Sequence, residues 1–286
     1  MILVTGATGH LGSAVVSHLL KNTAASNIVA FARDENKANH LREKGIEVRL
    51  GTYDNISSLD LAMQGIEKVL LISGNGPTRL QQHKNVVAAA KKAGIKHIVF
   101  TTIALKDMKT AAIRPLMGDL YQAEDYIKES GLTYTVLRNT LYSGATPLFG
   151  GEKVINTGIY LPTGNGKVPF ALRREMGEAA ANILIQNGHE NQTYQITASE
   201  LYSYGDVANE LSALSGRTVN FTDADPVTFP KRLKELGLPD IVVMLVTGFS
   251  ADIKNHQFEI VTRDMEKLLG RKPASLKEGL KEVFNL

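Results

Sequence analysis

Three glycines near the start of the sequence have the spacing of a turn that binds phosphate. Gly6, Gly9 and Gly12 come directly after the apolar residues 2–4 and open a segment with helical periodicity. In such a turn one glycine permits the sharp bend, one lets the backbone approach a pyrophosphate, and one lets the helix pack closely on the sheet. Free N–H groups of the first helical turn can then receive the phosphate charge.

This pattern predicts a dinucleotide site, and a purely structural strand-to-helix turn that binds nothing is the less favoured alternative. The predicted site is the continuous segment Gly6, Ala7, Thr8, Gly9, His10, Leu11 and Gly12.

Arg33 indicates which dinucleotide is bound. It ends the second apolar segment, about twenty residues after Gly12, where a group that recognises the adenosine ribose is expected. An Asp or Glu at this place accepts from the 2′-hydroxyl of NAD, whereas an Arg pairs with the 2′-phosphate of NADPH. Asp34 follows directly, and a solvated Arg at the end of a strand is the alternative. We interpret Arg33 as favouring NADPH.

The acid–base pair of many carbonyl reductases is not found. That mechanism uses a Tyr and a Lys in Y-x-x-x-K spacing, in which the Lys helps the Tyr to donate a proton. The nearest spacing here joins Tyr121 to Asp125, and a carboxylate would disfavour the phenolate. Carbonyl reduction by this mechanism, and nucleotide-sugar epimerisation, which needs the same pair, are therefore not expected. His83, with apolar residues further along its helix, is interpreted as a structural histidine.

Short apolar segments alternate with helix-period segments through the first half of the sequence. Strands are predicted at 2–4, 27–32, 47–50, 68–72, 97–101 and 134–137, and helices at 11–21, 37–44, 57–63, 81–93 and 119–130. Residues 69–72 and 98–100 are apolar without alternation, which is typical of strands buried on both faces. The fold class is therefore α/β, a Rossmann-type doubly wound parallel sheet with helices on both faces.

Beyond residue 144 the periodicity loosens, which predicts a smaller C-terminal α/β lobe. Glycine and proline recur through residues 147–166, after which a helix is predicted at 176–186 and a strand at 194–197. Further helices are predicted at 204–215, at 226–237 and from 273–276 onward. We assign residues 1–150 to a dinucleotide-binding domain, with a return segment near 176–198, and residues 151–286 to a substrate lobe.

Three short segments of the lobe receive a local interpretation. Residues 164–167 are expected to form a hairpin turn, since they lack the spacing of a P-loop, and residues 173–175 a solvated helix start. The apolar residues 242–249 fit either a core or an interface.

Composition excludes several classes of protein. Of the 286 residues, 43% are hydrophobic and 21% charged, as in ordinary globular domains. The net charge is +3, but Lys and Arg alternate with Asp and Glu, so a nucleic-acid partner is not expected. The lack of cysteine excludes disulfides and thiolate metal sites, and the scattered histidines predict no metal site. No signal peptide or bilayer-length apolar run is found, so we expect a cytoplasmic protein without membrane contact.

The sequence resembles the NmrA-like family of atypical short-chain dehydrogenases over nearly its whole length, and most closely the branch of NADPH:quinone oxidoreductases and triphenylmethane reductases. The resemblance rests on residues 4–12, 31–34, 70–73, 82–86, 134–139 with Tyr142, and 268–273. The first of these blocks and residues 134–139 are the most specific.

The resemblance implies which residues hold the cofactor. In that family they are the glycine turn, the Arg after the second strand, the Ser after the fourth strand and an N-x-x-Y segment after the sixth strand. Here those positions are Gly6 to Gly12, Arg33, Ser73, Asn139, Tyr142 and Ser143. Tyr142 is also the candidate wall of a pocket for nicotinamide and acceptor, with a packing tyrosine as the alternative. Thr52 replaces an acidic residue that is common in the family, which weakens the expected adenine contact.

The resemblance further implies an NADPH-dependent reductase that transfers hydride to a small planar electron acceptor such as a quinone, held between the sheet edge and the lobe; a homo-oligomer is possible. The family often has H-x-x-x-E-K in the helix before the sixth strand, but here Leu120 and Asp125 occupy the His and Lys positions. These replacements leave open a second function, that of a redox sensor that binds NADP or NADPH without robust catalysis.

Overall fold

The computed structural model describes residues 1–145 and 153–286, and the chain divides into two compact units. The first unit comprises Met1–Ile103, Asp119–Asn139 and Arg173–Tyr194. The second comprises Ala104–Gly118, Thr140–Leu172 and Gln195–Leu286. The domain boundary expected between residues 150 and 151 lies outside the described residues.

The first unit is built on a seven-stranded sheet with the strand order β3-β2-β1-β4-β5-β6-β9. The strands are β1 (Ile2–Thr5), β2 (Ile28–Ala32), β3 (Glu47–Leu50), β4 (Lys68–Leu71), β5 (His97–Ile103), β6 (Tyr134–Asn139) and β9 (Gln192–Ile196). All pairs from β3 to β6 are parallel. The N–H of Asn191 donates to the carbonyl of Tyr134 (2.6 Å) at one end of β6, and that of Thr140 to Ile196 (3.1 Å) at the other, so β9 runs in the same direction.

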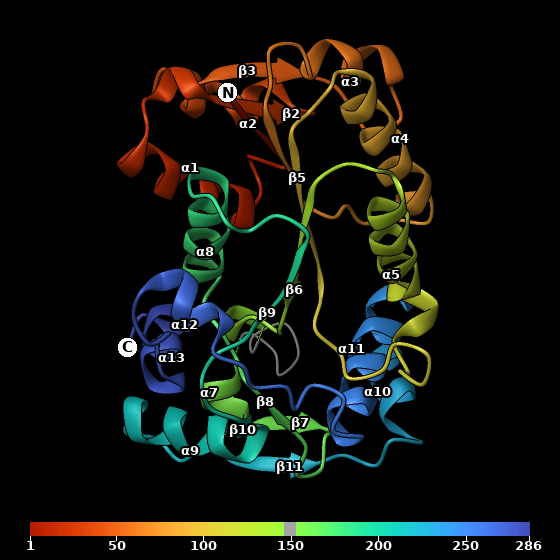
Figure 1. Ribbon diagram of the computed structural model, residues 1–286. Helices are drawn as coiled ribbons and strands as arrows, with labels where there is room; N and C mark the ends of the chain where they lie inside the picture. The colour runs from red at the N-terminus through yellow and green to blue at the C-terminus, as the bar shows by residue number, and fades with distance from the viewer. Residues whose placement is uncertain (146–152) are drawn as a thin grey trace. The chain divides into compact units, whose positions relative to one another are not determined.

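Helices cover both faces of this sheet, so the expected doubly wound α/β fold is confirmed. They are α1 (His10–Asn22), α2 (Glu35–Arg42), α3 (Ile56–Ala62), α4 (Arg79–Lys92), α5 (Arg114–Glu129) and α8 (Arg173–Ile185). Figure 1 shows α1 and α8 on one face and α3, α4 and α5 on the other. A Cβ on Gly177 would lie 2.6 Å from that of Ala14, so this glycine is what lets α8 approach α1.

The core of the first unit explains the apolar segments of the sequence. Every residue of β2 and β5 is buried, because helices cover both faces of these strands. Asp34 and Asn55 start α2 and α3 by accepting a backbone N–H with their side chains, as N-cap residues do. The short side chains at these two positions therefore determine where the chain leaves the strand edge and turns into a helix.

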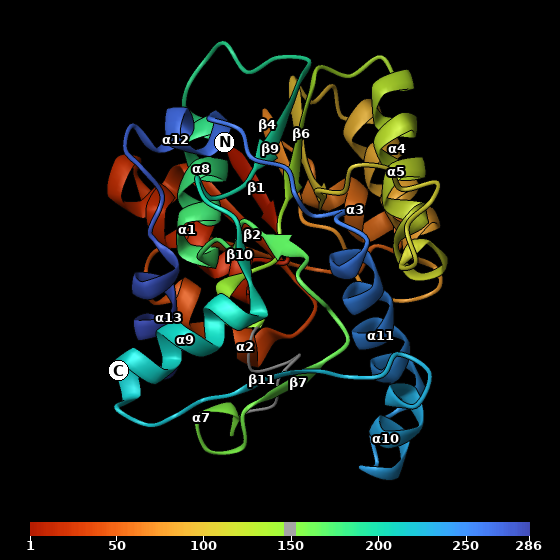
Figure 2. The ribbon, with the colours of Figure 1, turned by 90° about the horizontal axis from the view of Figure 1, so that it is seen from below.

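The second unit combines short strands with helices. Its elements are η2 (Ser143–Ala145), α7 (Val154–Thr157), β7 (Ile159–Leu161), β8 (Lys167–Val168), β10 (Tyr202–Ser203), α9 (Tyr204–Ser215), β11 (Phe221–Asp223), α10 (Phe229–Glu235), α11 (Asp240–Lys254), α12 (Asp264–Leu269) and α13 (Leu276–Phe284). Strand β10 pairs with β8 antiparallel and β11 with β7 parallel. Figure 2 shows α11 following α10 and α13 beside α9. Ser203 and Ser275 start α9 and α13 with capping boxes.

The hairpin predicted at residues 164–167 is wrong, because the flanking strands pair with partners distant in sequence, and the predicted solvated helix start at 173–175 is wrong for Glu175. The N–H of Gly166 does bond to Thr163 in a turn (3.1 Å), but β7 and β8 on either side pair with β11 and β10, so no hairpin forms. At the start of α8, Arg174 is exposed as expected, whereas Glu175 is buried.

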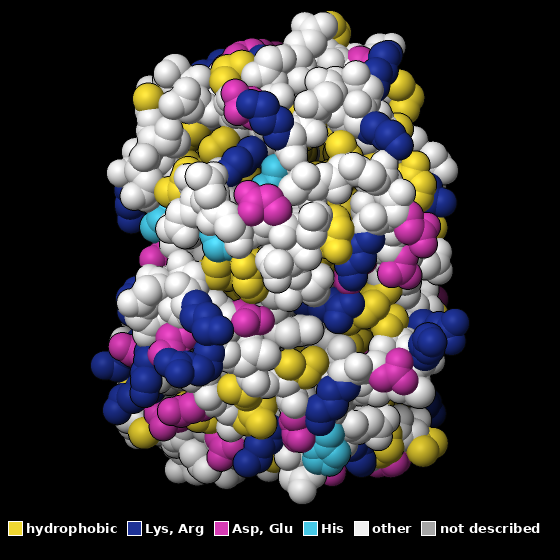
Figure 3. Space-filling view, viewed as in Figure 1, with side chains coloured by type: hydrophobic (Ala, Val, Ile, Leu, Met, Phe, Trp, Pro, Cys, Tyr) yellow, Lys and Arg dark blue, Asp and Glu magenta, His cyan; other side chains and the backbone are white. Residues whose placement is uncertain are grey.

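The apolar residues 242–249 lie in α11 and serve mainly the core. Val243, Val246 and Phe249 are buried, while Ile241 and Met244, on the other side of the helix, are exposed. None of the helices in the described parts of the chain is both long and apolar enough to cross a membrane. On the face drawn in Figure 3, acidic and basic side chains are interspersed, with a denser group of Lys and Arg over α12 and α13.

Candidate functional site

The glycine turn lies between β1 and α1 and has the close packing that its spacing predicts. Gly6 has a positive φ of 59°, which favours glycine, and the N–H of Gly9 donates to its carbonyl (2.9 Å). A Cβ on Gly12 would lie 2.7 Å from the carbonyl carbon of Gly6 and 2.8 Å from the Cα of Ala7, and closer still to the Gly6 oxygen. Gly12 therefore lets the first helical turn lie directly against the loop.

The start of α1 offers backbone donors to an anion. The first bond of the helix joins the N–H of Ser13 to the carbonyl of Gly9 (2.8 Å), so the N–H groups of His10, Leu11 and Gly12 precede the helical ladder. Within the described chain no side chain caps this end, and the first turn has no acidic residue. The partial positive charge of the helix start is thus available, which fits the pyrophosphate of a dinucleotide.

Arg33 and Asp34, at the end of β2, differ in their contacts. Arg33 is exposed, and its positive charge partly offsets the burial that raises the pKa of the nearby Tyr53 to about 12. The carboxylate of Asp34 accepts the N–H of Lys37 (3.2 Å) and caps α2. Asp34 is thus engaged in this cap, whereas the side chain of Arg33 makes no hydrogen bond or ion pair with the described residues.

Ser73 lies beside the glycine turn, at the carboxyl end of β4. Its neighbour Ile72 packs on the turn, since a Cβ on Gly6 would lie 3.6 Å from the Cβ of Ile72. The side chain of Ser73 is half-buried, and its N–H donates to the Oγ1 of Thr101 at the end of the adjacent β5 (3.0 Å). The structure therefore brings the predicted positions Gly6 and Ser73 together at one edge of the sheet.

The remaining predicted residues follow β6. Asn139 ends this strand, is 7% exposed and pairs in register with Ile103. Tyr142 and Ser143 belong to the second unit, where Tyr142 is half-buried and forms a bridge with Ala171. Ser143 donates its N–H to the carbonyl of Ala171 (2.9 Å) and is buried. A Cβ on Gly279 of α13 would lie 2.9 Å from its Oγ, so the Ser143 side chain packs under this helix.

The sequence of this chain is similar to that of known NADPH-dependent and NAD(P)H-dependent reductases. The profile of the NmrA-like family matches residues 1–282. The chain belongs to the NmrA-like family. It is 34% identical over 289 residues to quinone oxidoreductase 2 of Escherichia coli, covering 100% of this chain and 99% of that protein. It is 30% identical to the NAD(P)H azoreductase of Xenophilus azovorans, covering 84% of this chain and 82% of that protein.

Solved structures of the NmrA-like family superpose closely on this chain. The Escherichia coli NADPH-dependent quinone oxidoreductase complexed with NADPH has a TM-score of 0.93 at 33% identity, and each chain is covered in full. The Citrobacter sp. triphenylmethane reductase complexed with NADP(H) has a TM-score of 0.92 at 34% identity, with 99% of this chain and 100% of that chain covered.

The two positions of α5 that often hold His and Lys in NmrA-like proteins differ in burial. On α5, Leu120 is buried and Asp125 is exposed. The hydroxyl of Tyr121 donates to the carbonyl of Ile103 (3.1 Å), and the guanidinium of Arg138 lies 4.7 Å from its ring centroid. Tyr121 therefore contacts both β5, through Ile103, and β6, through Arg138.

Sequence reasoning missed polar residues that surround the edge of the sheet. Thr102 on β5 is buried, and its hydroxyl has no hydrogen-bond partner in the described chain. Arg79, at the start of α4, is 4% exposed and forms an ion pair with Asp119 of α5, its Nε lying 3.0 Å from Oδ2. The helix predicted from the sequence begins only at residue 81, so no local signal in the sequence indicates that Arg79 pairs with Asp119.

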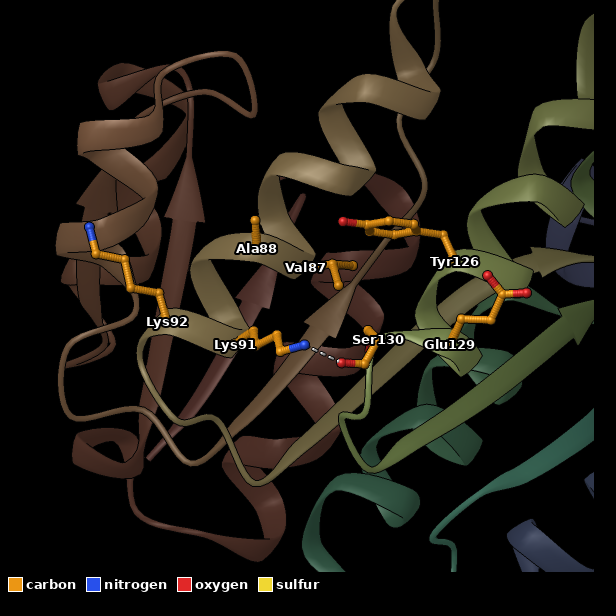
Figure 4. A pocket seen from close by; sticks show the side chains of 7 residues that line it. All are labelled: Val87, Ala88, Lys91, Lys92, Tyr126, Glu129 and Ser130. Atoms are coloured by element: carbon orange, nitrogen blue, oxygen red, sulfur yellow. Dashed lines mark hydrogen bonds between the residues drawn. The ribbon is translucent and has the colours of Figure 1, made fainter.

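A separate groove lies between α4 and α5 (Figure 4). It has a volume of about 560 Å³ and is lined by Val87, Ala88, Lys91, Lys92, Tyr126, Glu129 and Ser130. Lys91 crosses it to donate to the carbonyl of Ser130 (2.8 Å). These residues lie on the helices that cover the sheet, and none of them is a predicted cofactor residue. The described residues contain no cluster of His, Asp and Glu suited to a metal ion.

Proposed function

We propose that this protein is an NADPH-dependent oxidoreductase that transfers hydride to a quinone or a similar conjugated acceptor. The observation that carries the proposal is the glycine turn at the uncapped start of α1, which is shaped for a pyrophosphate and followed by Arg33 at the next strand end. The full-length similarity to quinone oxidoreductase 2 and to triphenylmethane reductase supports the same activity.

In this proposal the residues of the chain bind and orient the cofactor. The segment from Gly6 to Gly12 receives the pyrophosphate, Arg33 the 2′-phosphate, and Ser73, Asn139, Tyr142 and Ser143 the remainder of the dinucleotide. Bound NADPH would supply the hydride, and the quinone would take a further proton from water to become the hydroquinone. Because the reduced acceptor stabilises its own negative charge, no Tyr–Lys pair is required.

We also propose which parts of the chain bind the cofactor and which bind the acceptor. The dinucleotide-binding domain corresponds to residues 1–150 with the return segment near 176–198, and residues 151–286 form the substrate lobe. Tyr142 would form one wall of the pocket for the acceptor. We propose, as expected from the sequence, that the protein acts in the cytoplasm.

A second candidate function is a redox sensor that binds NADP or NADPH and signals through a partner. The burial of Leu120 and the exposure of Asp125 favour it, because both replace polar family residues on α5. A sensor must distinguish the oxidised from the reduced cofactor. Equal affinity for both forms, together with turnover of quinones, would exclude it.

The test is the oxidation of NADPH and of NADH, followed by absorbance, with 1,4-benzoquinone and a naphthoquinone. Native protein should turn over with NADPH, and Arg33→Ala should raise the KM for NADPH about tenfold or more, since a charge-assisted pair with the 2′-phosphate is lost. The matched control is Arg42→Ala, which removes an exposed Arg of α2 that pairs with Glu35 (3.2 Å). Tight NADPH binding without turnover of any quinone would favour the sensor.

A further inference from the structure

The backbone of residues 72–74, between β4 and α4, is held by side chains from the neighbouring elements. At Ile72, the N–H donates to the Oγ1 of Thr5 at the end of β1 (3.0 Å). The carbonyl of Ile72 accepts from the hydroxyl of Tyr53 (3.2 Å), whose ring stacks on Phe31 with 6.2 Å between centroids. Both polar groups of the Ile72 backbone are thus engaged by residues of the first unit.

The next two residues are held in the same way. Thr101 accepts the N–H of Ser73 (3.0 Å), and the Nε2 of His83 accepts the N–H of Gly74 (3.2 Å). The Nη1 of Arg79 donates to the carbonyl of Gly74 (3.4 Å). Both the N–H and the carbonyl of Gly74 are therefore bonded by side chains of α4.

Ser73 differs from its two neighbours in this segment. In the described parts of the chain, neither its hydroxyl nor its carbonyl has a hydrogen-bond partner, although every other polar backbone group from the N–H of Ile72 to the carbonyl of Gly74 has one. An arrangement that fixes the backbone and leaves one side chain available is what a preorganised ligand contact requires.

His83 has a property that a packing residue would not need. It is 1% exposed, and because its Nε2 accepts from Gly74, the proton is assigned to Nδ1. That Nδ1 is buried without a partner in the described chain, which is unfavourable for folding. Burial, and then the charge of Arg79, lower the pKa of His83 to about 4, so the imidazole stays neutral and Nε2 remains an acceptor.

Arg79 is oriented in turn by Asp119, with which it forms the buried ion pair described above. The His83 ring also packs edge-to-face with Phe100 of β5, with 5.2 Å between ring centroids. Rigid contacts of this kind fix the direction of the two side chains that hold Gly74.

We propose that His83 and Arg79, the latter oriented by Asp119, are positioning residues that hold the Gly74 peptide and thereby direct Ser73 toward the bound NADPH. The inference rests on the proposed function for its ligand. It assigns a cofactor-positioning role to a histidine that the sequence alone presents as structural.

Binding of NADPH, measured by calorimetry without any acceptor, tests the proposal. His83→Leu removes the acceptor for Gly74 and should raise the Kd for NADPH about tenfold, as expected for one lost hydrogen bond in a fixed site. His83→Gln offers an amide oxygen in place of Nε2 and should restore the Kd to within about threefold of native. Asp119→Asn, at a half-buried position on the surface of α5, should raise the Kd about threefold or more.

The matched control is His97→Leu, at the start of β5, the opposite end of that strand from Thr101 and Thr102. His97 is 4% exposed and bonds to the hydroxyl of Thr135 (2.8 Å), so its loss should lower Tm while leaving the Kd for NADPH unchanged. If His83→Leu does not fold, Asp119→Asn decides. An unchanged Kd in the folded His83 and Asp119 variants overturns the inference alone, whereas failure of the native chain to bind NADPH overturns the proposed function with it.

Discussion

Gly12 shows how a single hydrogen atom in place of a side chain permits a binding site. Its Cα lies so close to the turn that an added Cβ would meet backbone atoms of Gly6 and Ala7, which cannot move aside as a flexible side chain would. The same approach places the N–H groups of the first helical turn at the mouth of the loop. The close packing of the loop on α1, and the position of the N–H groups that can bind an anion, therefore both depend on Gly12.

We predict that Gly12→Ala weakens NADPH binding at least tenfold and lowers the free energy of unfolding by about 1–3 kcal/mol, the usual range for overpacking. Calorimetry and denaturant unfolding measure the two effects. Gly205→Ala is the control, because it also lies in the first turn of a helix but its Cβ would meet the Oγ of Ser203 at an ordinary 3.4 Å. Native affinity in Gly12→Ala would contradict the assignment of the turn.

Residues that act through local backbone geometry could be predicted from the sequence, and residues that act through distant partners could not. The spacing of Gly6, Gly9 and Gly12 after a strand, and Arg33 at the next strand end, are local patterns. By contrast, Thr101 and His83 bond to backbone groups of other loops, and nothing in their immediate sequence indicates those partners.

At the scale of elements, a buried carboxylate in α11 anchors the segment that follows β5. Asp252 is fully buried and accepts the N–H groups of Ala112 (2.6 Å) and Ile113 (2.9 Å). Gly248, one turn earlier, leaves room for Ile113, whose Cδ1 would lie 2.8 Å from an added Cβ. Within the second unit, α11 thus determines the conformation of Ala104–Gly118.

We predict that Asp252→Asn lowers the free energy of unfolding by about 1.5–3 kcal/mol, because the amide can accept only one of the two N–H groups and charged acceptors bind more strongly. Hydrogen exchange at Ala112 and Ile113 should become faster. The control is Asp225→Asn, since Asp225 accepts the N–H groups of Val227 (3.2 Å) and Thr228 (3.3 Å) in an exposed turn, where a much smaller loss is expected. Equal losses in both variants would refute the anchoring role of burial.

Elements with their own start signals were predictable, and elements that depend on partners were not. Helix α13 begins after Ser275, where the capping box and the preceding proline indicate a helix start. The two-residue strands β8 and β10 have no periodicity to detect and exist only because they pair with each other. Residues 242–249 of α11 are nearly continuously apolar, so their sequence fits either a core or an interface and does not indicate which side of the helix is buried.

At the scale of the whole molecule, the doubly wound sheet followed from the alternation of apolar and helix-period segments, but the assignment of Ala104–Gly118 to the second unit did not. The segment Ala104–Gly118 leaves the first unit after β5, and Arg173–Tyr194 returns to it as α8 and the start of β9. The unit to which a segment belongs depends on packing between residues far apart in the sequence. One example is the close approach of Gly177 to Ala14, which local periodicity does not indicate.

The stability of the molecule should fall as the pH falls from about 7 to about 5, because the fold keeps buried histidines neutral. Burial lowers the pKa of His83 from 6.5 to about 4, and it also lowers the pKa of His97 and of His189. Below 6.5 the unfolded chain binds a proton at His83 that the folded chain does not bind, so acid favours unfolding until the folded pKa is reached.

For His83 alone this linkage predicts a loss of about 2 kcal/mol in the free energy of unfolding between about pH 7 and about pH 5. Urea unfolding followed by circular dichroism measures the profile. His83→Leu should flatten it by that amount, since the titrating group is gone, whereas His40→Gln, at an exposed position of α2, should keep the native profile. A native profile that is flat over this range, or one that His83→Leu leaves unchanged, would mean that the imidazole takes up its proton in the folded state and so cannot serve as the acceptor that holds Gly74.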